Sequence, residues 1–122
     1  MLSILIRLLV MDKPKTSILL LDNIRSVENT ASIFRTADGF GVSKIFLIGT
    51  TPSPLDRFGR KRQDFAKVAL GAETSVDWEY QKDILPVIKY LKEQGFQIIS
   101  LEQDDRSQRL RDFKTLDQFA LI

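Results

Sequence analysis

The stretch from residue 17 to residue 48 restricts the fold more than any other part of this sequence. It holds two short apolar runs, SILLL at 17–21 and KIFLI at 44–48, on either side of a polar turn and a segment with helical periodicity. Apolar runs of this length are typical of strands buried on both faces, as in a parallel sheet. A strand, a helix and a strand within about thirty residues form a βαβ unit with a right-handed crossover. We therefore predict a three-layer α/β/α fold with a mostly parallel sheet.

The helix of this unit should begin after Ser26, a good N-cap residue, so that Glu28 faces the positive end of the helix dipole. Gly39 is the expected C-cap. The predicted buried stripe consists of Val27, Ala31, Phe34 and Ala37. Asn29 and Arg35 are polar residues within this otherwise apolar pattern, which makes them the first candidates for chemistry.

Five further elements follow along the chain. They are a short helix over 63–70, an edge strand over 74–80, a helix capped by Asp83, a buried strand over 96–101 and the opening of another buried strand at 119–122. The loop TTPSP at 50–54 comes at the carboxyl end of the second strand, where open α/β sheets bind ligands.

The pattern also predicts domain limits. Because the last apolar run has no covering helix after it, we expect residues 17–122 to be the N-terminal portion of a larger domain. We also expect an exposed apolar sheet edge there, and hence self-association. Residues 1–16 should be an N-terminal extension, although an extra strand or helix packed on the domain stays open. Their apolar part is shorter than the roughly 20 residues of a membrane span and lacks a signal-peptide cleavage site, so we expect a cytoplasmic protein without membrane contact.

Composition excludes several kinds of site. The chain is 43% hydrophobic and 28% charged, which is typical of a globular protein. It contains no cysteine, so disulfides and thiolate metal sites are excluded. It contains no histidine, the commonest general base and metal ligand, and we expect no metal site. The net charge of +2 says little about nucleic acid by itself.

The distribution of charge is more informative than its sum. Between residues 51 and 70 the sequence places five basic residues against Asp56 and Asp64. The basic residues are Arg57, Arg60, Lys61, Arg62 and Lys67. Two interpretations stay open, a loop that contacts phosphates and a solvated charged loop. Phe58 and Phe65 lie within this segment; we expect both to anchor the loop to the core, with base stacking as the alternative.

The stretch NTASIFRTADGFGVSKIFLIG, residues 29–49, resembles the first motif of the SpoU/TrmH family of RNA ribose methyltransferases, in the SPOUT superfamily. That motif pairs an Asn with an Arg six positions later, here Asn29 and Arg35, followed by Thr-Ala and Phe-Gly. Three further stretches resemble the family in order: LDNIRSVEN at 21–29, KVALGAETSVDWE at 67–79 and SLEQ at 100–103. Ala31 departs from the family, which usually has Gly there. The family's second and third motifs, which form its trefoil knot, correspond to positions beyond residue 122.

The resemblance implies a SPOUT-like α/β knot domain truncated before the knot. It implies methyl transfer from S-adenosylmethionine to a ribose 2′-hydroxyl of tRNA or rRNA, with most of the cofactor pocket beyond residue 122, and a homodimer. Arg35 and Asn29 are then the catalytic candidates. Arg35 would hold the substrate phosphate first and act as the proton acceptor second, and Asn29 would orient the ribose or the arginine. Arg25 and the five basic residues of the 51–70 segment would bind RNA.

Other interpretations stay open. Arg35 could instead form a structural ion pair with Asp38 or Glu28, and Arg25 could be a solvated turn residue. The alternative function is a non-catalytic RNA-binding or dimerising remnant of the same fold. An unrelated flavodoxin-like nucleotide-binding domain is disfavoured, because no glycine-rich phosphate loop follows the first strand.

Overall fold

The computed structural model describes residues 16–101, 105–109, 113–114 and 116–122. The predicted N-terminal extension, apart from Thr16, and part of the SLEQ stretch lie outside the described residues.

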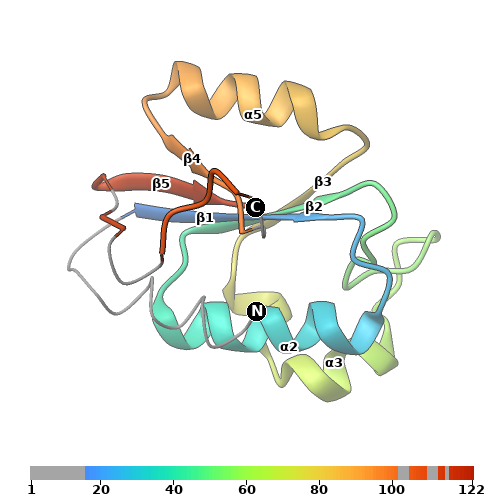
Figure 1. Ribbon diagram of the computed structural model, residues 1–122. Coiled ribbons are helices and arrows are strands. Elements are labelled where there is room, and N and C mark those ends of the chain that lie inside the picture. The colour runs from blue at the N-terminus through green and yellow to red at the C-terminus, as the bar shows by residue number, and fades with distance from the viewer. Residues whose placement is uncertain (1–15, 102–104, 110–112, 115) are drawn as a thin grey trace.

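A five-stranded sheet forms the centre of the described chain (Figure 1), and every pair of neighbouring strands is parallel. The order across the sheet is β3-β2-β1-β5-β4. The strands are β1 (Thr16–Asp22), β2 (Lys44–Ile48), β3 (Trp78–Gln81), β4 (Gln97–Ile99) and β5 (Gln118–Leu121). The predicted α/β fold with a parallel sheet is confirmed.

Helices lie on both faces of this sheet (Figure 1). One face carries α2 (Val27–Phe40), α3 (Gln63–Ala69) and α4 (Ala72–Ser75), and the other carries α5 (Ile84–Glu93). Strand β1 shows why its central residues, 18–21, are all apolar. Leu19 and Leu21 belong to the core on the α2 side, whereas Ile18 and Leu20 belong to the core on the α5 side. A strand covered on both faces has no position at which a polar side chain reaches water.

Helix α2 begins as predicted and ends later than predicted. The Ser26 hydroxyl accepts a hydrogen bond from the Asn29 N–H at 3.1 Å, which is the expected N-cap. The C-cap is Gly41 and not Gly39, so that prediction is wrong. Gly41 has a left-handed φ of 72°, and its N–H reaches the carbonyls of Ala37 and Asp38. Only the residue that reverses the chain needs this conformation, so Gly39 remains helical.

The remaining elements are partly as predicted. The short helix at 63–70 is confirmed as α3, and β3 does lie at an edge of the sheet. However, Thr74 and Ser75 belong to α4, because Gly71 (φ 92°) starts a helical turn and its carbonyl accepts from the Thr74 hydroxyl at 2.9 Å. Asp83 is at the N-cap position of α5, but its side chain forms no capping bond.

The two C-terminal strands agree with the predictions only in part. The strand predicted over 96–101 is the short β4, which lies at the other edge of the sheet. The run at 119–122 is confirmed as a buried strand, and β5 pairs with both β1 and β4. The expectation of an exposed apolar edge at the end of the chain is therefore wrong, because both sides of β5 are already hydrogen-bonded.

Candidate functional site

A pocket of about 300 Å³ opens where the carboxyl ends of β1 and β5 meet the first half of α2. Its lining is largely apolar, with Leu21, Ile24 and Ile122 among its side chains. Asn29 and Ser32 of α2 are its polar lining residues within the described chain. This position agrees with the rule that open parallel sheets bind ligands outside the carboxyl ends of their strands. The pocket is therefore the candidate ligand site of the described chain.

A network of polar contacts holds the loops above this pocket in place. Asn23, in a left-handed conformation (φ 56°), accepts hydrogen bonds at Oδ1 from the Thr50 N–H at 3.0 Å and from the Thr50 hydroxyl at 3.3 Å. The Thr51 hydroxyl lies 2.6 Å from the Leu21 carbonyl and accepts from the Ile24 N–H at 3.1 Å. These contacts join the ends of β1 and β2 and position the chain that leads into α2.

Sequence reasoning missed this network. Asn23 lies in the polar turn after the first strand, and its partner Thr50 is 27 residues away in the chain. The available signal was the pair of polar runs that follow two adjacent parallel strands, because their carboxyl ends meet at one edge. Ser32 was missed as well, although it is three residues after Asn29 and hence its neighbour on the helix surface.

Asn29 and Arg35 are both exposed on α2 and lie outside its buried stripe. With Ser32 they form a row at three-residue intervals, which spans about 9 Å along the helix axis. Asn29 and Ser32 line the pocket, whereas Arg35 lies beyond it along the row. Within the described part of the chain, Arg35 forms no ion pair, so neither the bridge to Asp38 nor the bridge to Glu28 is present. Its guanidinium is thus available to a ligand.

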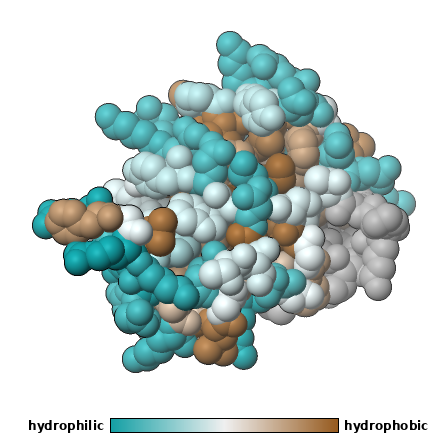
Figure 2. Space-filling model, turned by 180° about the vertical axis from the view of Figure 1, so that it is seen from behind, coloured by the Kyte–Doolittle hydropathy of each residue, from teal (hydrophilic) through white to brown (hydrophobic). Residues whose placement is uncertain are grey.

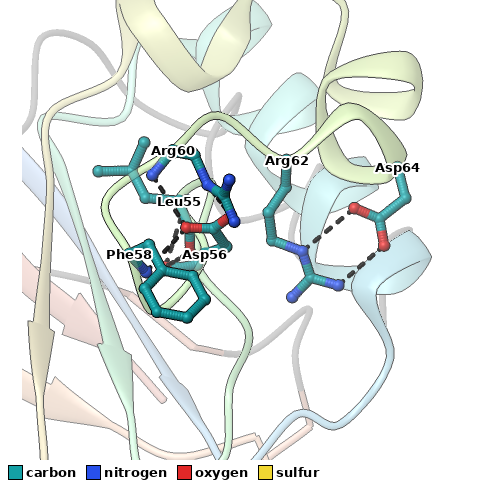
Figure 3. A network of polar contacts seen from close by, with 7 residues as sticks. Leu55, Asp56, Phe58, Arg60, Arg62 and Asp64 are labelled. Carbon is teal, nitrogen blue, oxygen red and sulfur yellow. Dashed lines mark hydrogen bonds and ion pairs between the residues drawn. The ribbon is translucent and has the colours of Figure 1, made fainter.

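Part of the basic segment forms an arm, residues 55–61, which follows β2 and is closed at its base by an antiparallel bridge between Leu55 and Lys61. Asp56 organises this turn (Figure 3). Its Oδ1 accepts from the N–H groups of Phe58 and Arg60 at 2.8 and 2.9 Å, and its Oδ2 accepts from the Arg60 Nε at 3.2 Å. The Arg60 N–H is the main reason why the pKa of Asp56 lies below its ordinary value.

The basic residues differ in how far their charge is already compensated. Arg62 donates two hydrogen bonds to Asp64, at 2.8 and 3.1 Å (Figure 3), and this pairing lowers the pKa of Asp64. Arg60 is paired with Asp56. The other three basic residues of the segment are exposed and form no ion pair within the described part of the chain. They are Arg57, Lys61 and Lys67. Arg25 is exposed immediately before the N-cap of α2.

The two phenylalanines of the segment have opposite environments. Phe65 is fully buried and packs edge-to-face on Phe34 at 5.1 Å, so it anchors α3 to α2 as predicted. Phe58 is 66% exposed, and the prediction that it also anchors the loop is wrong. The Asp56 contacts and the left-handed Gly59 (φ 78°) hold the turn in a shape that leaves the Phe58 ring in solvent.

Comparison with known proteins identifies the family. No curated protein sequence matches the chain. The model of the SpoU rRNA methylase family matches residues 16–122. The chain belongs to the SpoU rRNA methylase family.

Solved SpoU structures show the same fold. The A. aeolicus TrmH/SpoU tRNA-modifying enzyme superposes with a TM-score of 0.71 at 20% identity, over 99% of this chain and 58% of that one. The SpoU methyltransferase AviRb from Streptomyces viridochromogenes, solved in complex with its cofactor AdoMet, gives 0.67 at 18% identity, over 93% and 44%. This SpoU-family chain thus spans about half the length of these relatives.

The pocket of this SpoU-family chain suits only part of such a cofactor. Its apolar lining could cover a flat ring, and Asn29 and Ser32 could make hydrogen bonds. S-adenosylmethionine also carries a carboxylate, an ammonium and a sulfonium, and no charged side chain of the described residues lines the pocket. These residues therefore do not form a complete cofactor site. No helix in the described part of the chain is long and apolar enough to cross a membrane, and no cluster of carboxylates there is suited to a metal ion.

Proposed function

We propose that this chain serves the methylation of a ribose 2′-hydroxyl in tRNA or rRNA, with Arg35 and Asn29 on the RNA side of the reaction. The family match over residues 16–122 carries the proposal. It is supported by the position of Asn29 in the pocket at the carboxyl edge of the sheet. It is also supported by Arg35 in the same row of α2, which has no ion-pair partner among the described residues.

The chemistry assigns different tasks to the two residues. A planar guanidinium with several donors matches a phosphate, and Arg stays protonated in proteins, so Arg35 anchors a backbone phosphate and does not act as the base. The amide of Asn29 both donates and accepts, which suits a ribose hydroxyl. Ser32 lies between them and can contact the same nucleotide. Holding the weakly nucleophilic hydroxyl in place is a large part of such catalysis.

S-adenosylmethionine is the proposed cofactor, and it supplies an electrophilic methyl group when bound. Within the described chain, the apolar lining of the pocket beside Asn29 and Ser32 could cover part of it. The carboxylate, ammonium and sulfonium of this cofactor would need partners other than the described residues that line the pocket. Arg25 and the five basic residues of the 51–70 segment would extend the RNA contact along the same edge of the sheet.

Transfer of a tritiated methyl group from S-adenosylmethionine to a mixture of tRNA and rRNA tests the proposal. Arg35→Ala should lower the rate about 10-fold to 100-fold, because it removes charge-assisted hydrogen bonds to phosphate. Arg35→Lys should recover part of the loss, since the charge returns without the planar fork. Lys89→Ala, an exposed cation on α5 at the opposite face, is the matched control and should behave as wild type.

The second candidate function is a non-catalytic RNA-binding or dimerising chain, and the observation that favours it is that no charged side chain of the described residues lines the pocket. Calorimetric titration with S-adenosylmethionine separates the two candidates. Binding heat together with methyl transfer supports the first candidate. RNA binding without cofactor heat contradicts the first and leaves the second. Homodimer formation and a cytoplasmic location stay proposals.

A further inference from the structure

The tip of the arm presents an aromatic ring to solvent among positive charges. Phe58 is 66% exposed, and the guanidinium carbons of Arg57 and Arg60 lie 4.9 and 5.0 Å from its ring centroid. In Figure 2 the arm protrudes at the left edge, with apolar surface flanked by hydrophilic surface. The arm leaves the carboxyl end of β2, so it projects from the same edge of the sheet as the pocket (Figure 1).

The backbone that carries the ring is held in this position before any ligand binds. Asp56 accepts hydrogen bonds from the N–H groups on both sides of the turn, those of Phe58 and Arg60. The Leu55–Lys61 bridge closes the base of the arm, and Asp56 and Arg60 also pair through their backbones at 2.8 Å. An aromatic platform that is already ordered loses little conformational freedom when a ligand stacks on it.

We propose that Phe58 is a stacking platform for an unpaired base of the RNA substrate, with Arg57 and Lys61 contacting the adjoining phosphates. This inference rests on the proposed function and adds that the chain recognises a single-stranded or looped-out nucleotide. Every base offers a π face, and aromatic side chains in positively charged surfaces are a common means of holding unpaired RNA. In a duplex the bases are already stacked on each other, so the Phe58 face would have no free partner.

The charges next to the ring favour RNA over an apolar protein surface. Burying Phe58 in a protein interface would also bury the neighbouring guanidiniums, and desolvating a charge without a partner is unfavourable. Arg60 has a carboxylate partner, but Arg57 has none within the described part of the chain. An RNA strand supplies a base for the ring and phosphates for Arg57 and Lys61 at the same time.

The test is a binding titration with a short single-stranded RNA that carries one 2-aminopurine base, whose fluorescence falls when it stacks. Wild type should bind the single strand and quench the probe. Phe58→Leu, which keeps apolar bulk without a ring, should weaken binding about tenfold and abolish quenching while leaving the salt dependence unchanged. Phe58→Trp should retain both. Arg57→Ala should retain quenching and reduce the slope of log affinity against log salt by about 0.7.

Two controls separate stacking from other roles of the ring. Leu85→Ala removes a side chain that is 74% exposed on the opposite face, and it should bind as wild type. The same RNA annealed to its complement should bind Phe58→Leu and wild type alike. If Phe58→Leu binds with unchanged affinity and still quenches the 2-aminopurine fluorescence, the stacking role alone is overturned. A changed oligomeric state of that variant in light scattering overturns it as well. Failure of wild type to bind any RNA overturns the proposed function as well.

Discussion

Gly49, directly after β2, lies against the side chain of Asn23, directly after β1. It has a left-handed φ of 66°, and a Cβ atom at this position would lie 2.1 Å from the Asn23 Oδ1. We expect Gly49→Ala to lower the free energy of unfolding by about 2–3 kcal/mol, from the backbone strain and the loss of the two Thr50 hydrogen bonds. Gly41→Ala is the matched control, because Gly41 has a similar φ of 72° with open space around it.

Urea denaturation measures both variants. The clearest comparison repeats Gly49→Ala in an Asn23→Ala background, where the clash is absent and the cost should fall to that of Gly41→Ala. Equal costs for the two glycines in the wild-type background would contradict the Asn23 contact.

Asp56 gives a second prediction at the residue scale. Its pKa is lowered from the ordinary 3.8, first by the Arg60 N–H and further by the Phe58 N–H and the Arg60 side chain. Because the pKa is lower in the folded state, ionised Asp56 stabilises the turn at pH values above its ordinary pKa. This contribution is lost as the pH falls through the folded-state pKa. Carbon-13 NMR of the carboxyl groups should show Asp56 titrating below 3.8. In Arg60→Ala the pKa should rise only in part, because the backbone N–H remains; titration of wild-type Asp56 at or above its ordinary value would contradict the arrangement.

At the scale of the elements, local patterns in the sequence predicted what depends on neighbouring residues. The βαβ unit, the Ser26 cap and α3 were predicted, because each follows from periodicity or a single capping residue. The choice between Gly39 and Gly41 was not predictable, since both glycines can adopt a left-handed backbone. The exposed Phe58 was missed for a related reason: its direction is set by the Asp56 hydrogen bonds, and an alternating pattern of rings and charges does not contain that information.

The candidate site shows the same division between local and long-range information. Asn29 and Arg35 were named from the sequence because they are polar positions in an otherwise apolar helical pattern, and because the family resemblance includes their spacing. The pocket beside Asn29 was not predicted, because β5 is about a hundred residues from β1 in the chain, and only their pairing brings Leu121 next to Leu19. Strand order across a sheet is a property of such long-range pairs.

The whole molecule depends on its last strand, since β5 joins β4 and β1 and thereby connects the two ends of the sheet. Phe119 of β5 is 1% exposed and packs in the core on the α2 side. We expect Phe119→Ala to lower the free energy of unfolding by about 3–5 kcal/mol, whereas Leu85→Ala on the surface of α5 should change it by less than about 0.5 kcal/mol.

Two probes of urea denaturation show whether this loss is global. Trp78 lies on β3 at the far edge of the sheet from β4, and its fluorescence should report the same transition as the helical circular dichroism signal in both wild type and Phe119→Ala. Coincident transitions would mean that loss of β5 packing destabilises β3 as much as α5, because the sheet and its helices unfold as one cooperative unit. A Trp78 transition that stays at the wild-type midpoint in Phe119→Ala would show instead that β1, β2 and β3 fold with α2 independently of the C-terminal strand.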